Sequence, residues 1–197
     1  MTKIPHPAES LILAKIPDSV LQRAQGVRLV AFDVDGVLTD GSLLFGENGE
    51  QLKRFNSLDG HGLKMLQQSG ILVALITGRR GPIVSRRAAE LGIALVYQDA
   101  RDKSQLLLNL CAEHSLNLEQ IAYIGDDIID LLAMQKVGFA ASVPSAPAYV
   151  VQAAHWVTSK EGGYGAAREF CDVILAAQGL LGHFLQGSRL VTSEAIQ

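Results

Sequence analysis

The sequence predicts an α/β protein with a Rossmann-like, doubly wound parallel sheet. Short apolar runs alternate with stretches of helical pattern along most of the 197 residues, and this alternation is typical of βαβ units. The first run, RLVAFDVD at 28–35, is almost continuously apolar before its acids, as expected of a strand buried on both faces. Several runs end in acidic or small polar residues, and ligands gather at the carboxyl ends of such strands. The functional residues are therefore expected at that edge of the sheet.

The remaining elements follow in order along the chain. Residues 1–26 predict an N-terminal arm and a short helix that Asp18 would cap and Gly26 would end. Further strands are expected at 71–77, 93–97, 121–127, 138–143 and 155–158, and helices at 60–69, 80–91, 103–115, 128–136, 146–153 and 165–178. The weakly patterned tail at 179–197 is expected to be extended. We interpret residues 1–197 as a single domain.

One segment departs from the alternation. Residues 41–56 carry apolar runs on both sides of Glu47-Asn48-Gly49-Glu50, and Asn-Gly is a strong tight-turn signal. The segment therefore predicts a β-hairpin directly after the first strand. The other loops are short, so no large cap domain is expected.

Composition excludes several classes of function. With 48% hydrophobic and 19% charged residues, the chain is expected to fold around a buried core. A net charge of −3 argues against binding to nucleic acid or to an acidic membrane. Cys111 and Cys171 form no CxxC pair, which favours buried, inert thiols over a disulfide or zinc site. No apolar run reaches membrane-spanning length and no signal sequence is evident, so a cytoplasmic location is expected.

The acids after the first strand suggest a metal site. Asp33 and Asp35 are two residues apart, so in extended chain they project to the same side. Asp126 would reach the same edge from another strand. Carboxylates so close together repel each other, and a hard cation such as Mg²⁺ would relieve that cost. Gly36 would let the chain turn and present backbone N–H groups to an anion.

Two other segments supply groups suited to phosphate. Thr77 and Gly78 end an apolar run, where a hydroxyl and backbone amides would hold phosphate oxygens. Lys103 begins a helix after the third strand and would place positive charge where negative charge develops. Each feature alone has an ordinary structural explanation, as a helix cap, a turn or a solvated lysine. Their occurrence in order, each at a strand end or a helix start, favours a functional site.

These segments resemble a known family. DVDGVLTD, LITGR, Lys103 and GDDIIDL resemble the four motifs of the haloacid dehalogenase superfamily over residues 28–178. ENGEQLKRFNSLDGHG and EGGYGAAREFCDVIL further resemble a capless subfamily of sugar-acid phosphatases. The resemblance implies Mg²⁺-dependent hydrolysis of 3-deoxy-D-manno-octulosonate 8-phosphate through an aspartyl-phosphate, a step of lipopolysaccharide biosynthesis.

The same resemblance implies roles for the acidic residues. Asp33 would attack phosphorus and also bind Mg²⁺. Asp35 would act as general acid and then general base, while its backbone carbonyl binds the metal. Asp126 would complete the protein ligands, and Asp127 or Asp130 would orient that site.

Phosphate and substrate contacts are implied in the same way. Thr77, Gly78 and Lys103 would bind the transferring phosphoryl group. The residues implied to bind the substrate are Asp35, Phe55, Asn56, Ser57, Leu58, Asp59, Lys64, Arg79 and Arg87. An ordinary helix-surface role is the open alternative for Lys64 and Arg87. The chain departs from the subfamily at Lys64, where arginine is expected, and at Tyr164, where some members carry arginine.

The resemblance also implies a homotetramer in which neighbouring chains close each site. Leu43, Leu44 and Phe45 support this, because one subunit would not easily bury such an apolar hairpin. Two alternatives remain open: a phosphatase acting on a nine-carbon sugar-acid phosphate, and a phospho-aspartate signalling domain. Asp35 argues against the latter, because an acid/base group beside an aspartyl-phosphate shortens its life.

Overall fold

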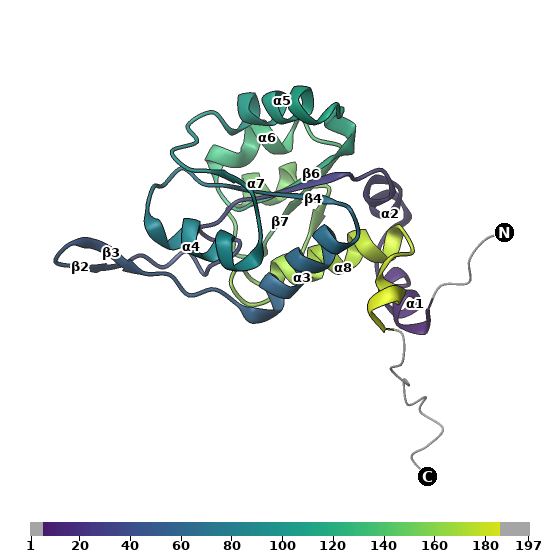
Figure 1. Cartoon of the computed structure of the whole chain (residues 1–197). Coiled ribbons are helices and arrows are strands. Elements are labelled where there is room, and N and C mark those ends of the chain that lie inside the picture. Colours follow the sequence, from purple (N-terminus) through teal and green to yellow (C-terminus); the bar gives the residue numbers. More distant parts are fainter. Residues whose placement is uncertain (1–5, 186–197) are drawn as a thin grey trace, which may run out of the picture.

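A parallel sheet forms the centre of the molecule. In the computed structural model, which describes residues 6–185, six strands pair in the order β5-β4-β1-β6-β7-β8 (Figure 1). All of their pairings are parallel, as the sequence predicts. The strands are β1 (Leu29–Phe32), β4 (Leu72–Ile76), β5 (Leu95–Tyr97), β6 (Ile121–Gly125), β7 (Phe139–Ser142) and β8 (Trp156–Val157).

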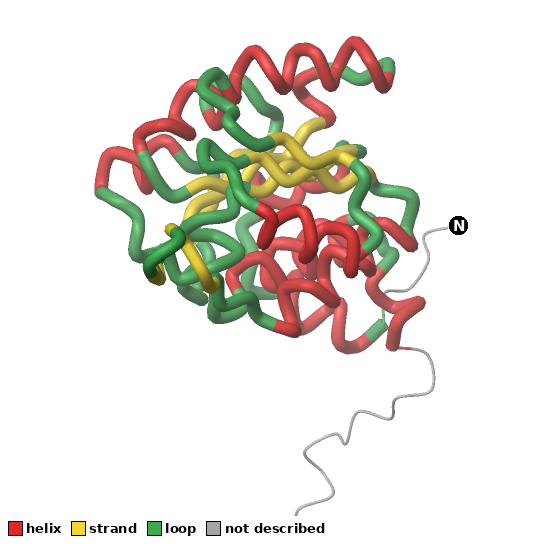
Figure 2. Tube along the Cα trace, turned by 60° about the vertical axis from the view of Figure 1, so that its left-hand side comes forward, coloured by secondary structure: helices red, strands yellow, loops and turns green. Residues whose placement is uncertain are grey.

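Helices cover both faces of this sheet (Figure 2). On β1, Val30 and Phe32 belong to one apolar core, whereas Leu29 and Ala31 belong to the other. The first core is completed by α2 (Asp18–Gln25), α3 (Ser57–Gln68), α4 (Pro82–Leu91) and α8 (Ala166–Ala177). The second is completed by α5 (Lys103–His114), α6 (Leu131–Met134) and α7 (Ala148–Ala153). Burial on both faces explains why the strand sequences are continuously apolar.

The N-terminal arm is partly helical, which corrects the prediction. Helix α1 (Pro7–Leu13) is capped by the preceding residue His6, whose side chain accepts a hydrogen bond from the N–H of Ala8. Glu9 accepts the N–H of His6 at 2.8 Å and that of Gly182 at 2.7 Å, so this helix is fixed to the C-terminal part of the chain. A capping box with proline at the first turn overrides the irregular appearance of the proline-rich segment.

Two further segments differ from the expectation. The helix expected over 128–136 is a 3₁₀ turn (Ile128–Asp130) followed by the short α6, because side chains of Asp127 and Asp130 satisfy the local N–H groups. In the tail, Leu181–Leu185 form a 3₁₀ helix rather than extended chain, and residues 186–197 lie outside the described part. Another 3₁₀ turn covers Leu118–Gln120.

The predicted hairpin is present and projects from the body of the molecule (Figure 1). Strands β2 (Leu44–Gly46) and β3 (Gly49–Leu52) pair antiparallel, with Gly49 at a φ of 99°. Phe45 and Leu52 are each 64% exposed. The hairpin therefore presents apolar surface that the rest of residues 6–185 leaves exposed.

The remaining sequence expectations concern cysteine and membrane contact. Cys171 is buried and Cys111 is partly buried, and both are free thiols. Among residues 6–185, none of the helices is long and apolar enough to cross a membrane.

Candidate active site

Three carboxylates meet at the carboxyl edge of the sheet. Asp33 follows β1, Asp126 follows β6, and Asp130 ends the adjoining 3₁₀ turn. One oxygen from each lies within 4.8 Å of the others. Parallel strands that are neighbours in the sheet deliver residues distant in sequence to one place.

A buried lysine lies against this cluster. Lys103, the first residue of α5, is 2% exposed and donates hydrogen bonds to Asp33 and, at 2.6 Å, to Asp130. The same Asp130 oxygen accepts the hydroxyl of Tyr123 at 2.5 Å. Its other oxygen accepts the N–H groups of Asp126 and of Asp127, each at 3.1 Å. With both oxygens occupied in this way, Asp130 is suited to orient Lys103 and the Asp126 loop rather than to bind a ligand.

Burial and mutual repulsion dominate the electrostatics of the cluster. Burial raises the pKa of Asp33 well above its usual value, against the opposing effect of Lys103. Burial, followed by repulsion from Asp130 and Asp127, raises the pKa of Asp126 to about 7. Burial acts to lower the pKa of Lys103, but Asp33 and Asp130 outweigh it and raise the pKa. Lys103 therefore remains charged, but its single positive charge does not cancel the repulsion among the carboxylates around it.

This set of donors fits a divalent cation. Oxygen donors from Asp33 and Asp126 are those that Mg²⁺ prefers, and a cation would remove the repulsion that raises both pKa values. The side chain of Asp35 does not belong to the cluster. The resemblance implies that Asp35 binds the metal through its backbone carbonyl and not through its side chain. The absence of the Asp35 side chain from the cluster therefore does not contradict this role.

We expect magnesium binding to stabilise the protein more strongly as pH rises. In the metal-free protein, the folded-state pKa of Asp126 lies above its ordinary value of 3.8, at about 7. The folded state therefore binds more protons than the unfolded state in that window, and its stability falls as pH rises through it. A cation replaces that proton, so the Mg²⁺-induced rise in melting temperature should be larger near pH ~8 than near pH ~5.5. Thermal unfolding with and without Mg²⁺ measures this, and Asp126→Asn should remove most of the difference. Equal shifts at both pH values would contradict it.

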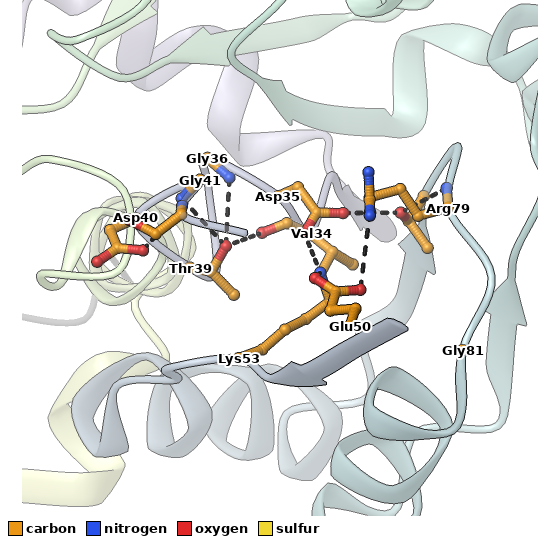
Figure 3. Close-up of polar contacts among 12 residues, drawn as sticks. Val34, Asp35, Gly36, Thr39, Asp40, Gly41, Glu50, Lys53, Arg79 and Gly81 are labelled. Carbon is orange, nitrogen blue, oxygen red and sulfur yellow. Dashed lines mark hydrogen bonds and ion pairs between the residues drawn. The ribbon is translucent and has the colours of Figure 1, made fainter. Parts of the chain in front are cut away.

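The side chain of Asp35 is held by contacts from two other segments (Figure 3). One of its oxygens accepts a hydrogen bond from Lys53, and the other accepts the hydroxyl of Thr77 at 3.2 Å. The Thr77 hydroxyl in turn accepts the N–H of Arg79 at 3.1 Å. Asp33 and Asp35 both lie after the end of β1 at Phe32. The expectation that they project to the same side assumed extended chain, and it stays a prediction.

Glycines bring the loop after β1 close to its neighbours. Gly36 has a φ of 93°, and a Cβ there would lie 2.0 Å from a carboxylate oxygen of Asp126. A Cβ on Gly162 would lie 1.7 Å from the carbonyl oxygen of Gly36. Thr39 secures the same loop, donating to the carbonyl of Val34 and accepting N–H groups from within the loop (Figure 3). Only glycine at these positions permits the approach between the acidic loop and the segment before α8.

Some of the predicted substrate residues gather beside α3. Asn56 caps α3, accepting the N–H of Leu58, and donates to the carbonyl of Gly163 at 3.3 Å. Arg87 lies over the ring of Phe55, 5.6 Å from its centroid, and donates to the carbonyl of Asn56 at 3.4 Å. Asp59 is 2% exposed and accepts the N–H of Arg168 at 2.8 Å. Its other oxygen has no hydrogen-bond partner among residues 6–185, and Asp59 is one of the residues that line a cavity of about 10 Å³.

The other predicted substrate residues are dispersed. Arg79 reaches the hairpin, where it lies 3.7 Å from Glu50. Ser57 borders a different surface cavity beside α4, and Leu58 lines a cavity of about 390 Å³ on the side of α1 and α8. Among residues 6–185, the side chain of Lys64 has no hydrogen-bond or ion-pair partner. Gly78 leaves open space, because a Cβ there would meet only the side chain of Ile129 at 3.9 Å.

Sequence reasoning missed four residues of the site: Glu50, Lys53, Thr39 and Tyr123. Lys53 and Glu50 lie on the hairpin, which the sequence marks only as apolar strands around a turn. Tyr123 lies within an apolar strand, where an aromatic residue indicates core packing. Lys53 lies between Leu52 and Arg54 near the end of the predicted hairpin, where a charged residue has no distinguishing pattern.

Comparisons with known proteins place this chain in a family. Residues 89–169 match a family described as haloacid dehalogenase-like hydrolase. A 3-deoxy-D-manno-octulosonate 8-phosphate phosphatase from Yersinia pestis is 47% identical over 163 residues, covering 83% of this chain and 87% of that protein.

Two solved structures are similar over most of the chain. The phosphatase of the same name from Moraxella catarrhalis, in complex with magnesium, phosphate and KDO, is 41% identical with a TM-score of 0.84, covering 86% of this chain and 98% of that one. The cobalt-bound deoxy-D-mannose-octulosonate 8-phosphate phosphatase from Haemophilus influenzae is 45% identical with a TM-score of 0.78, covering 80% and 92%.

Proposed function

Because this chain belongs to the haloacid dehalogenase-like hydrolases, among the 3-deoxy-D-manno-octulosonate 8-phosphate phosphatases, we propose that it releases phosphate from that sugar acid. The product would be the free eight-carbon sugar acid used in lipopolysaccharide biosynthesis. The observation that carries the proposal is the cluster of Asp33, Asp126 and Lys103 at the carboxyl edge of the sheet, in which Asp33 and Lys103 are buried. Asp35 follows two residues after Asp33.

In the proposed mechanism Asp33 is the nucleophile. Its carboxylate oxygen attacks phosphorus, the bond from phosphorus to the sugar oxygen breaks, and Asp35 donates a proton to that oxygen. Asp35 then takes a proton from water as the water attacks the aspartyl-phosphate, which frees Asp33 and inorganic phosphate. Dividing one displacement into two is the usual advantage of a covalent intermediate, and one carboxyl group serves as acid and then as base.

Charge stabilisation falls to the residues around the nucleophile. Lys103, Thr77 and the N–H of Gly78 are proposed to bind the phosphoryl oxygens. Asp33, Asp126 and the backbone carbonyl of Asp35 are proposed to hold Mg²⁺. When bound, the cation supplies positive charge that offsets the negative charge of the phosphoryl group and the carboxylates.

A further group of residues is proposed to bind the sugar and its carboxylate. Arg79 and Arg87 are suited to the sugar carboxylate, since guanidinium groups bind carboxylates in a bidentate manner. Residues proposed to border the sugar are Phe55, Asn56, Ser57, Leu58, Asp59 and Lys64.

We further propose that residues 1–197 form one domain, that the protein is cytoplasmic, and that it is a homotetramer. The exposed apolar side chains of the hairpin support self-association, because a contiguous apolar projection is rarely left in water.

The assembly has a direct test. Phe45→Glu places a charge on an exposed hairpin side chain, so it should leave the chain folded but shift the assembly toward smaller species. Light scattering on the eluting protein measures the mass. A wild-type chain that elutes as a monomer would remove the proposal of a tetramer.

The activity is tested by phosphate release from a panel of sugar phosphates. The panel includes 3-deoxy-D-manno-octulosonate 8-phosphate and a nine-carbon sugar-acid 9-phosphate, each with Mg²⁺ and with EDTA. We expect metal-dependent turnover with a strong preference for the eight-carbon compound. Preference for the nine-carbon compound would reassign the substrate, while absence of turnover on every compound would reject the phosphatase.

A further inference from the structure

The hairpin brings a lysine into the candidate active site. Lys53 follows β3 directly, and its side chain is only 3% exposed although the hairpin beside it faces solvent. It contacts two carboxylates, Asp35 and Glu50, the second at 2.7 Å. A lysine buried to this extent has exchanged hydration for these partners, so its position is well defined.

Together these contacts fix one orientation of Asp35. The carboxylate is held on one oxygen by Lys53 and on the other by Thr77. A carboxylate bound on both oxygens has little freedom to rotate, and a proton donor must lie within hydrogen-bond reach of the atom it serves. Glu50 restrains the lysine from the other side and also lies 3.7 Å from Arg79. Figure 3 shows Glu50 between Lys53 and Arg79 in this chain of alternating charges.

We propose that Lys53 is a positioning residue: it orients Asp35 for proton transfer and thereby makes the hairpin a part of the catalytic apparatus. The inference rests on the proposed phosphatase function and assigns a role within it. Lys53 acts through Asp35 and is not itself proposed to donate or accept the proton. Glu50 supports the orientation by holding Lys53.

The test is Lys53→Met, which keeps most of the length of the side chain and removes its charge. Two substrates separate the possible effects. The leaving oxygen of 3-deoxy-D-manno-octulosonate 8-phosphate needs a proton, whereas p-nitrophenolate leaves without one. We expect the first-turnover rate on the sugar phosphate to fall by about 10²-fold, as for impaired general acid catalysis. The p-nitrophenol burst should stay within about twofold of wild type.

Three comparisons complete the experiment. Lys136→Met removes an exposed lysine from the end of α6 and should leave both rates unchanged. Lys53→Arg restores the charge and should recover part of the sugar-phosphate rate. In an Asp35→Asn background, adding Lys53→Met should cost no more than about twofold, because residues acting through one another are not additive.

The outcomes separate the alternatives. A higher KM at unchanged kcat would assign Lys53 to substrate binding, and equal losses on both substrates would assign it to hairpin structure; either result overturns the inference. A full additional loss in the Asp35→Asn background would do the same. A wild-type protein with no metal-dependent activity would instead reject the phosphatase function itself.

Discussion

Asp33→Asn is expected to lower kcat on the sugar phosphate by about 10⁴-fold or more, as removal of a covalent nucleophile does. The amide is nearly isosteric with the carboxylate but neutral, and it is a poor nucleophile. The amide oxygen can still accept a hydrogen bond from Lys103, which also keeps Asp130 as its partner, while one of the repelling charges of the cluster is removed. The folded protein should therefore persist while turnover is lost.

Rapid-quench detection of the phosphorylated enzyme is the decisive readout for this variant. Wild-type protein mixed with substrate should show acid-stable label on the chain, and Asp33→Asn should show none. Asp35→Asn should also turn over very slowly but still form some of the labelled intermediate from p-nitrophenyl phosphate. An Asp33→Asn protein with wild-type turnover would refute the covalent mechanism.

Lys103→Met is expected to have the second largest effect, on stability as well as on rate. Lys103 and its two carboxylate partners are all almost fully buried, and removing one member of a buried ion pair costs about 3–5 kcal/mol. Loss of positive charge beside the phosphoryl group should lower kcat by about 10²–10³-fold, as for other preorganised electrostatic groups.

The same substitution should change the dependence of rate on pH. Lys103 holds the pKa of Asp33 down against burial, so its removal raises that pKa further. The nucleophile then loses its charge at a higher pH, and the acid limb of the pH–rate profile should move upward. Chemical unfolding and pH profiles with saturating Mg²⁺ check both effects, and Lys103→Arg serves as the charge-preserving comparison. An unmoved acid limb would argue against coupling between the two residues.

The sequence predicted the sheet well because strands that are buried on both faces have continuously apolar sequences. Runs such as 29–32 and 121–125 are apolar at every position, and parallel connectivity then follows from the intervening helices. The order of the acidic residues at strand ends was equally readable, and the structure brings Asp33, Asp126 and Lys103 together.

Other parts could not be predicted because they depend on contacts between distant segments. Helix α1 owes its stability partly to Glu9, whose partner Gly182 lies at the other end of the chain. Asp35 accepts a hydrogen bond from Lys53, which lies 18 positions later in the sequence. No periodic pattern in the sequence predicts such a contact. Leu58 likewise lines a cavity beside α1 and α8, a position set by the helix face on which it lies.

The contact between Gly162 and the loop after β1 limits how far this protein can be shortened. The residues with proposed chemical roles all precede position 131, so a fragment ending at Asp130 would contain every one of them. Gly163, however, donates its N–H to the carbonyl of Val37 at 3.0 Å, and Gly162 lies against Gly36. Such a fragment would lack the surface that keeps the acidic loop in shape, and it would also expose Phe32, which packs on Phe170. Splitting the chain before residue 160 should therefore yield two inactive pieces, with activity returning only if the pieces reassociate.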